Sequence, residues 1–514
     1  MRWFWWIAIV LAAILVLWFI GRLIFPVPET DGRAAETAIP FDPETTLGPR
    51  AAEALSAHPG QSGVVPLPDG GGALISRILL ADGAERSIDV MYYIWHDDVS
   101  GMMLLGALRD AAERGVRVRL LLDDNGIAGM DPILAALNAM PNMHVRLFNP
   151  STVRSPKGLG YALYPLRMNR RMHNKAFIVD GAVAIVGGRN IGDEYFAVGE
   201  VPPYLDLDVL GVGDVVSDTA TIFDEYWNSA PVIELERVIR GEGDRTALDD
   251  AITAARQSED GKTVVAQTGS AASRMIGGAA APMEWTEVQV VADDPQKGMG
   301  THDRSQLMIT RLAGILGGVK GNLDLISAYF VPGKAGTKYF ADMAQSGVAV
   351  RILTNSWQAT DVPMVHAGYV KYRRELLQAG VHLYELRPIE GLMQGKAELG
   401  PFGSSGASLH AKTFSADDAR VFIGSFNFDP RSAALNCEMG FLIDSPAIAR
   451  SGTEALTDGL AQRSFRPMLD GDKMIWLDPQ PDGSAVRIEH EPGLNVFDRV
   501  LVYVMNVLPI EWLL

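Results

Sequence analysis

The feature that most constrains the fold is an internal repeat of a strand–helix–strand unit. In the first copy, Ser87–Trp95 and Val116–Asp124 have the apolar character of buried strands and flank a helical pattern over Met102–Gly115. The same order recurs over Asn322–Ser356. Because a strand–helix–strand unit is the building block of a parallel sheet covered by helices, the chain is predicted to be two copies of one α/β domain.

The sequence divides into three parts. Residues 1–45 hold an apolar segment and a proline-containing linker, residues 46–285 the first α/β domain, and residues 286–514 the second. The stretch Ala266–Met283, rich in Ala, Gly and Ser, has too few large apolar residues for a core of its own and is predicted to be the interdomain linker. Apolar residues recur at helical spacing over Phe497–Leu508, which predicts an amphipathic segment that either lies at a membrane interface or packs on the protein.

The composition excludes several classes of protein. With 48% hydrophobic and 21% charged residues, the chain of 514 residues is a folded protein rather than a disordered polyelectrolyte. Its formal net charge of −17 would repel a run of phosphates, so nucleic acid is not expected as a partner. The single cysteine, Cys437, excludes an intrachain disulfide and a cysteine-based metal site.

The N-terminal residues predict a membrane anchor. Trp3–Ile20 is an uninterrupted apolar run between Arg2 and Arg22, and a helix of this length nearly crosses the hydrocarbon core of a bilayer. The run is longer than the apolar part of a usual signal peptide, and no small-residue cleavage site follows it, so a single-pass anchor is expected rather than a cleaved signal. The flanking charges weakly favour a cytoplasmic N-terminus, which places the body of the protein outside the cytoplasm.

A pattern of reactive residues, His-x-Lys-x4-Asp, occurs twice in the chain at the spacing of the repeat. Each copy is followed by a turn, Gly187–Asn190 in the first and Gly424–Asn427 in the second. Two copies in register are far beyond coincidence, so the motif belongs to the duplicated unit. The six motif residues are His173, Lys175, Asp180, His410, Lys412 and Asp417.

The spacing within the motif indicates phosphoryl chemistry. In an extended strand, residues i and i+2 point to the same face, so His-x-Lys places an imidazole beside an ammonium group. Imidazole can act as nucleophile or general acid, and ammonium can hold phosphoryl oxygens. Two such pairs around one phosphorus atom need no metal, since two lysines supply the positive charge that Mg²⁺ provides elsewhere. We therefore expect neither a metal nor a cofactor.

These motifs resemble those of the phospholipase D superfamily over nearly the whole chain from about residue 60. More narrowly, the segments RMNRRMHNK, from Arg167, and GSFNFDPRS, from Gly424, are similar to bacterial cardiolipin synthases. The resemblance implies two tandem phospholipase D-like α/β domains. With the apolar run at Trp3–Ile20 and its flanking charges, it predicts an enzyme anchored by one transmembrane helix in the bacterial inner membrane, with its body in the periplasm. It also implies a phosphatidyltransferase acting on phospholipids, with phosphatidylglycerol as substrate and phosphatidylethanolamine as a second candidate. A phospholipase D hydrolase, releasing phosphatidic acid with water as acceptor, would use the same residues and stays an alternative. The sequence identifies no protein partner.

The resemblance also implies roles for individual residues. One histidine forms a phosphohistidine and the other protonates the leaving alcohol; we assign His173 to the first role and His410 to the second, although the order could be reversed. The groups expected at the phosphate oxygens are Lys175, Lys412, Asn190, Asn427 and Ser425; the first turn has Gly188 in place of this serine.

Carboxylates and arginines complete the expected site. Members of the family hold the second nitrogen of each imidazole with a carboxylate beyond the turn, for which Glu438 is the candidate in one half and either Asp206 or Asp208 in the other. Asp180 and Asp417 are expected to fix the motif loops more than to take part in chemistry. Arg167, Arg170 and Arg171 are expected to capture an anionic headgroup, unless they are simply solvated. The resemblance also suggests His366, Tyr369 and Arg373 at the lipid site, although core packing explains Tyr369 equally well.

Overall fold

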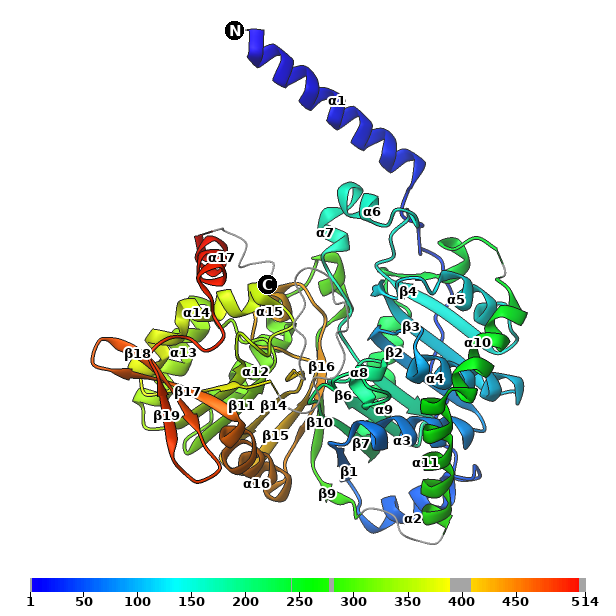
Figure 1. The fold of residues 1–514 in the computed structure, drawn as a ribbon. Helices are drawn as coiled ribbons and strands as arrows, with labels where there is room; N and C mark the ends of the chain where they lie inside the picture. The colour runs from blue at the N-terminus through cyan, green and yellow to red at the C-terminus, as the bar shows by residue number, and fades with distance from the viewer. Residues whose placement is uncertain (1, 242, 277–281, 389–407, 508–514) are drawn as a thin grey trace.

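The structure is a computed structural model that describes residues 2–241, 243–276, 282–388 and 408–507. Two α/β domains lie side by side, each built on one large β-sheet with helices on its faces (Figure 1). The strands of the first sheet, in spatial order, are β8 (Val232–Glu234), β4 (Met143–Phe148), β3 (Arg117–Gly126), β2 (Ser87–Ile94), β5 (Ala176–Val179), β6 (Val183–Gly187), β7 (Asp208–Gly213), β1 (Ser62–Leu67) and β9 (Glu284–Thr286). Those of the second sheet are β10 (Val288–Ala292), β16 (Met439–Ile443), β15 (Arg420–Gly424), β14 (Lys412–Ala416), β11 (Asn322–Ser327), β12 (Ala349–Asn355), β13 (His382–Leu386), β17 (Ser464–Asp470), β18 (Lys473–Pro479) and β19 (Ala485–Ile488).

Helices connect these strands and cover the sheets. In the first half they are α1 (Arg2–Ile24), α2 (Gly48–Ala57), α3 (Gly70–Asp82), α4 (Val99–Glu113), α5 (Asp131–Asn138), α6 (Gly158–Leu163), α7 (Pro165–Met168), α8 (Asp193–Phe196), α9 (Asp214–Trp227), α10 (Arg245–Gln257) and α11 (Glu259–Ile276). In the second half they are α12 (Met308–Leu316), α13 (Gly333–Gln345), α14 (Pro363–Gln378), α15 (Pro430–Ala434), α16 (Pro446–Glu454) and α17 (Val496–Val507).

Each sheet is mixed rather than parallel, which corrects the expectation drawn from the strand–helix–strand units. Those units form the parallel trios β2-β3-β4 and β11-β12-β13, and the other strands pair antiparallel. The motif strands belong to the antiparallel part, because β5 is joined to β6, and β14 to β15, by three-residue turns that are too short for a parallel crossover. The two copies match residue by residue. Ala176 pairs with Val186 in the first sheet, and the equivalent Thr413 pairs with Ile423 in the second.

The expected linker is only partly a linker. Ala266–Ile276 continues helix α11, which packs on α3, because alanine favours helix and Val264 on this helix is buried in the first core. The rest of the stretch includes residues 277–281, outside the described part of the chain. The chain passes from the first sheet to the second between Thr286 and Val288, beside the boundary expected at residue 285.

The two domains share a core. One apolar cluster joins Val186 of β6 and Val209 of β7 to Ile423 of β15 and to Met439 and Phe441 of β16. Because these strands follow the two motifs, the shared core fixes the relative position of the two motif strands.

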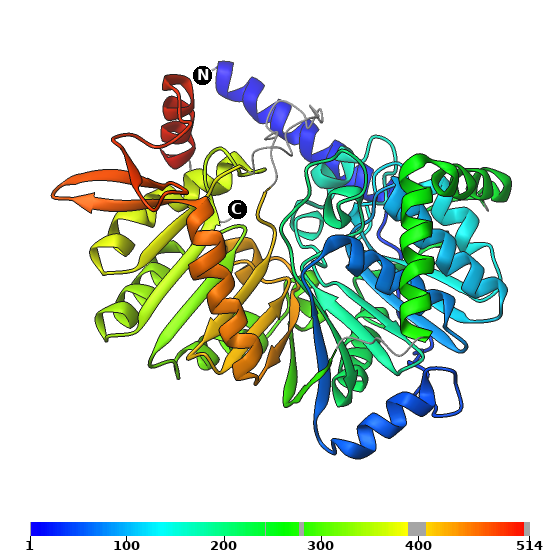
Figure 2. The ribbon, with the colours of Figure 1, turned by 60° about the horizontal axis from the view of Figure 1, so that its bottom comes forward.

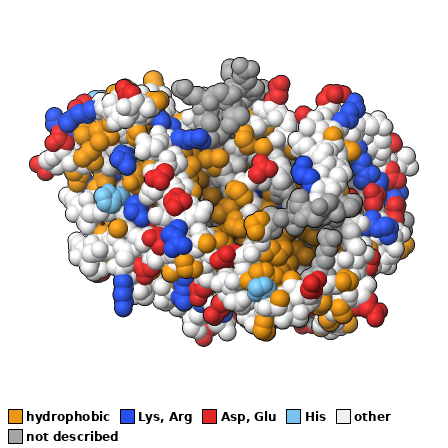
Figure 3. Space-filling view, turned by 90° about the horizontal axis from the view of Figure 1, so that it is seen from below, with side chains coloured by type: hydrophobic (Ala, Val, Ile, Leu, Met, Phe, Trp, Pro, Cys, Tyr) orange, Lys and Arg blue, Asp and Glu red, His pale blue; other side chains and the backbone are white. Residues whose placement is uncertain are grey.

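Helix α1 projects from one side of this body (Figures 1 and 2). Its segment Trp3–Ile24 has a mean hydropathy of 2.7 and none of the side chains in it is buried, so it is long and apolar enough to cross a membrane. On the face opposite α1, acidic and basic side chains are interspersed around a central apolar area (Figure 3).

Candidate active site

The site lies where the two domains exchange backbone hydrogen bonds. Each motif histidine stands just before its strand, β5 or β14, and its backbone N–H donates across the domain boundary. His173 donates to the carbonyl of Cys437, and His410 donates to the carbonyl of Leu205, both at 2.8 Å. The two contacts are related by the repeat, so the motifs face each other about a pseudo-twofold axis.

Each histidine is held by a carboxylate from the other domain. Nδ1 of His173 lies 2.8 Å from Glu438 Oε2, and Nδ1 of His410 lies 2.5 Å from Asp206 Oδ2. All four side chains are buried. In the described part of the chain, both imidazoles make their hydrogen bonds through Nδ1, which leaves Nε2 as the reactive nitrogen of each ring.

Strand register decides between Asp206 and Asp208. Gly187 of β6 faces Asp208 of β7, and the equivalent Gly424 of β15 faces Gly440 of β16. Asp208 therefore corresponds to Gly440, and Asp206, two residues earlier, corresponds to Glu438. Asp208 is instead paired with Arg77 at 2.8 Å and with Arg189 at 3.5 Å, so its proposed contact with an imidazole is wrong.

The difference between Gly188 and Ser425 follows from the different lengths of the two carboxylates. A Cβ atom on Gly188 would stand 2.1 Å from Asp206 Oδ1, so only glycine leaves room for the shorter acid. In the other half, the Ser425 hydroxyl donates to Glu438 Oε2 at 2.5 Å, and Ser432 donates to Glu438 Oε1 at 2.9 Å. Ser425 is thus directed at the carboxylate, and this corrects its expected role as a phosphate ligand.

The protonation states follow from burial. Burial lowers the pKa of both histidines to about 4, and the Lys412 ammonium acts on His410 in the same direction. Burial alone would raise the pKa of Glu438 and of Asp206. Contact with the imidazoles outweighs burial and lowers the pKa of both carboxylates, so they stay ionised. Each pair is therefore a neutral imidazole whose Nδ1–H donates to a carboxylate.

The two lysines lie inside the same site. Lys175 Nζ donates to the His173 carbonyl at 2.6 Å, and Lys412 Nζ donates to the His410 carbonyl and lies 3.0 Å from Nδ1 of that ring. Burial lowers the pKa of Lys175 to about 7 and also lowers the pKa of Lys412. Lys412 also lowers the pKa of His173, and Lys175 that of His410, so the four basic groups act on one another. A bound anion would offset this concentration of positive charge.

The motif aspartates lie at the other end of the motif strands. Asp180 accepts backbone N–H groups of residues 85–87, and Asp417 accepts those of residues 320–322. Both have positive φ, 52° and 54°. They fix the turn after each strand and do not reach the histidines.

The two asparagines close the turns. Asn190 Oδ1 accepts from the N–H of Ile94, and its amide donates to the Tyr195 hydroxyl at 3.0 Å. Asn427 Oδ1 accepts from the N–H of Tyr329 at 3.3 Å. Their oxygens thus join each turn to β2 or to the end of β11, and any phosphate contact must come from the amide nitrogen.

Comparison with known proteins identifies the family. The profile described as "Cardiolipin synthase, PLD-like domain" matches residues 78–200 and 314–457. Cardiolipin synthase C of Escherichia coli is 44% identical to this chain, over 91% of the chain and 100% of that protein. The chain belongs to the phospholipase D superfamily. It is a cardiolipin synthase-like phosphatidyltransferase of that superfamily.

Other similarities agree with this family. A protein of Helicobacter pylori without an assigned function is 34% identical over 92% of this chain and 94% of its own length. The crystal structure of phosphatidylserine synthase from Haemophilus influenzae covers 90% of this chain and 100% of that chain, with a TM-score of 0.57 at 14% identity. This last similarity shows a shared fold.

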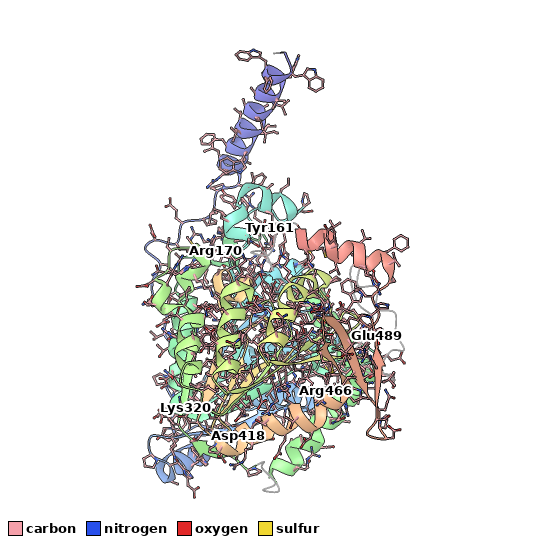
Figure 4. The ribbon with its side chains drawn as sticks, turned by 90° about the vertical axis from the view of Figure 1, so that its left-hand side faces the viewer. Tyr161, Arg170, Lys320, Asp418, Arg466 and Glu489 are labelled. Atoms are coloured by element: carbon pink, nitrogen blue, oxygen red, sulfur yellow. The ribbon has the colours of Figure 1, made fainter. Side chains whose placement is uncertain are left out.

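The arginines before His173 do not form the headgroup patch that their clustering in the sequence predicted. Arg171 is buried, lies 3.2 Å from Asp123 and donates to the Asn149 carbonyl, so it is a structural group. Arg167 and Arg170 are half-buried, and each donates to a backbone carbonyl. Arg170 lies on the side of the protein that bears α1 (Figure 4).

The suggested lipid-site residues of α14 serve the C-terminal segment instead. His366 Nε2 lies 2.6 Å from Glu491 Oε1, and Arg373 makes ion pairs with Glu491 and with Glu385. The Tyr369 hydroxyl donates to Glu385 at 3.1 Å. The contacts of Glu491 fasten the chain just before α17 to the second domain, and those of Glu385 join α14 to β13.

Sequence reasoning missed the aromatic walls of this phospholipase D site. Tyr93 packs against His173 with ring centres 5.0 Å apart, and Tyr195 and Tyr204 pack against His410 at 5.2 and 5.3 Å. The closeness of Tyr195 to Asn190, five residues earlier in the chain, is the sequence signal that could have pointed to it. Nothing in the sequence pattern distinguishes Tyr93 or Tyr204 from core tyrosines.

Proposed function

We propose that this cardiolipin synthase-like enzyme transfers a phosphatidyl group through a covalent phosphohistidine at His173. The observation that carries the proposal is the pair of crossed carboxylate–imidazole contacts, Glu438 with His173 and Asp206 with His410. Each contact occupies Nδ1 and directs Nε2 toward the substrate, which is the arrangement that nucleophilic and acid–base histidines require.

In the first step, Nε2 of His173 attacks the phosphorus of the donor lipid. A P–N bond forms, the P–O bond to the headgroup alcohol breaks, and the proton on Nε2 of His410 passes to the departing oxygen. The low pKa of His173 keeps its nitrogen unprotonated for attack. The negative phosphodiester offsets the charge of the two lysines, and this raises the pKa of His410 enough for it to carry a proton.

In the second step, an acceptor hydroxyl attacks the phosphohistidine. His410 takes the hydroxyl proton, a P–O bond forms, and the P–N bond to His173 breaks. With phosphatidylglycerol as donor and acceptor, the products are cardiolipin and glycerol; phosphatidylethanolamine is the second candidate lipid. Water as acceptor would give phosphatidic acid, so positioning of the lipid hydroxyl decides the outcome.

The proposal also places the enzyme relative to the membrane. Helix α1 would hold the body at the outer surface of the bacterial inner membrane, with a cytoplasmic N-terminus. In that position both lipids reach the site from one leaflet.

The test is product analysis by mass spectrometry. Detergent-solubilised full-length protein is incubated with phosphatidylglycerol alone and with added phosphatidylethanolamine. We expect cardiolipin as the main product and phosphatidic acid as a minor one. Phosphatidic acid as the main product at saturating acceptor lipid would identify a hydrolase and overturn the transferase assignment.

A further inference from the structure

Helix α17 has its apolar face turned outward. Its exposed apolar side chains are Val496, Phe497, Val500, Leu501, Tyr503 and Val504, with Val496 73% and Phe497 86% exposed. At 100° per residue these six positions cover one continuous arc, and the buried Val502 lies on the opposite side. A helix that packs on a soluble protein buries its apolar face and exposes its polar face. The exposed apolar face of α17 is therefore expected to contact another apolar surface.

The position of α17 is fixed. The chain reaches it from Glu491, whose carboxylate is paired with His366 at 2.6 Å and with Arg373 at 2.8 Å. The helix itself packs on α14, which carries both partners. These buried contacts hold α17 in one orientation on α14, so its apolar face points in one direction.

A second exposed apolar patch lies at α6 and α7. Leu159 is 50% exposed and Leu166 69%. This patch is joined to α1, since the indole N–H of Trp18 donates to the Ala162 carbonyl at 3.2 Å and the Arg22 guanidinium lies 4.7 Å from the ring centre of Tyr164.

Helices α1, α6, α7 and α17 all lie on one side of the molecule (Figures 1, 2 and 4). The reactive histidines precede the motif strands at the end nearer that side. Strand β14 (Lys412–Ala416) begins two residues after His410 and ends two residues before Asp418, and Asp418 lies at the far end of the body from α1, whereas Arg170, shortly before His173, lies at the near end (Figure 4).

We propose that α17 is a further membrane contact, lying in the headgroup region of the bilayer with Phe497 and Val500 immersed. The protein then contacts the membrane at three places: α1, α6–α7 and α17. Continuity with α1 favours a bilayer over a protein partner, because a helix apolar enough to span a membrane shares this side with both patches. The apolar arc of α17, about 160° wide, is suited to an interfacial helix. The inference does not depend on which lipids react.

Depth measurement in vesicles tests the proposal without turnover. The full-length Phe497→Cys variant is labelled with an environment-sensitive fluorophore and reconstituted at less than one copy per phosphatidylglycerol–phosphatidylcholine vesicle. Cys437 is buried, and burial raises the pKa of its thiol to about 12, so it does not compete for the label. Val486→Cys on β19 is the matched control, since Val486 is 51% exposed and β19 lies on the flank of the second domain, away from α1 (Figure 1).

We expect lipid-borne quenchers to quench the label at position 497 several-fold more than the label at position 486. Equal quenching at the two positions would overturn the proposal. Quenching at 497 only when several labelled copies share a vesicle would assign the apolar face to a second copy of the chain and would overturn it as well.

A kinetic measurement gives an independent readout. Phe497→Asp with Val500→Asp should lower the rate on vesicle-embedded phosphatidylglycerol by roughly tenfold and leave the rate in detergent micelles unchanged, because micelles reach the site without a flat surface. An equal loss in both assays would contradict the proposal. Absence of turnover in the unmodified protein would contradict the proposed function and leave the depth result to decide this inference.

Discussion

Asp206 belongs to the first domain, whereas His410, whose Nδ1 lies 2.5 Å from its carboxylate, belongs to the second. Glu438 and His173 make the reciprocal contact. Neither domain therefore contains a complete half-site, and the reactive tautomer of each histidine depends on the docking of the two domains. The duplication has produced one shared site rather than two independent ones.

Both histidines should be indispensable. His173→Ala and His410→Ala are each expected to lower kcat/KM by roughly 10³-fold or more, because each ring performs a step that the other cannot take over. The measurement is cardiolipin formation by mass spectrometry. His144→Ala is the matched control, since His144 is exposed on β4, and should leave activity unchanged. Retained activity in either site variant, with an unchanged Tm, would contradict the paired-histidine mechanism.

Gly188 should tolerate no side chain. In Gly188→Ala the new Cβ would displace Asp206 from His410, and we expect kcat/KM to fall by about 100-fold. Ser425→Ala removes only one hydrogen bond to Glu438 and should cost at most about tenfold. Gly269→Ala on α11, where nothing lies within 4 Å of the new Cβ, should be neutral. Equal activities of the first and third variants would show that Asp206 does not position His410.

The pH dependence of kcat/KM should be shifted to lower pH than ordinary histidines and lysines would give. The free enzyme reacts with His173 unprotonated and His410 protonated, and burial lowers the pKa of both groups to about 4, so kcat/KM should be highest near pH 4 and decline at higher pH. Above about pH 7 the decline should steepen as Lys175, whose pKa burial lowers to about 7, loses its charge. Rates measured between pH 4 and 9 in buffers of constant ionic strength check this. An acidic limb centred near pH 6.5 would show that His173 titrates like a solvent-exposed histidine.

Activity should persist in excess EDTA. Two lysines and two histidines supply the charge and the proton transfer, and the carboxylates at the site are occupied by the imidazoles. The assay is cardiolipin formation after dialysis against EDTA. Loss of activity that one added divalent ion restores would contradict this mechanism.

A topology reporter tests the side of the membrane. A reporter enzyme that is active only in the periplasm is fused after residue 45. We expect it to be active, because Arg2 keeps the N-terminus in the cytoplasm and the fusion point lies on the other side of the membrane. A fusion active only in its cytoplasmic form would reverse the orientation and leave the chemistry unchanged.

Features that are local or repeated could be predicted from the amino-acid sequence. The spacing of His-x-Lys-x4-Asp, its recurrence and the turns that follow indicated the superfamily and its fold. The apolar run from Trp3 to Ile20 indicated a long apolar helix. These signals are visible because the residues that act together, such as His173 and Lys175, are close in the chain.

Which residues of the two domains meet could be learned only from the folded protein. Asp206 and Asp208 share a strand environment in the sequence, and strand register alone sends one to His410 and the other to Arg77. Arg171 appeared suited to a headgroup but pairs with Asp123 inside the core. The carboxylates cross between domains because the pseudo-twofold axis places each turn beside the opposite motif. Such contacts depend on packing between segments more than 200 residues apart, and local sequence patterns carry no information about that packing.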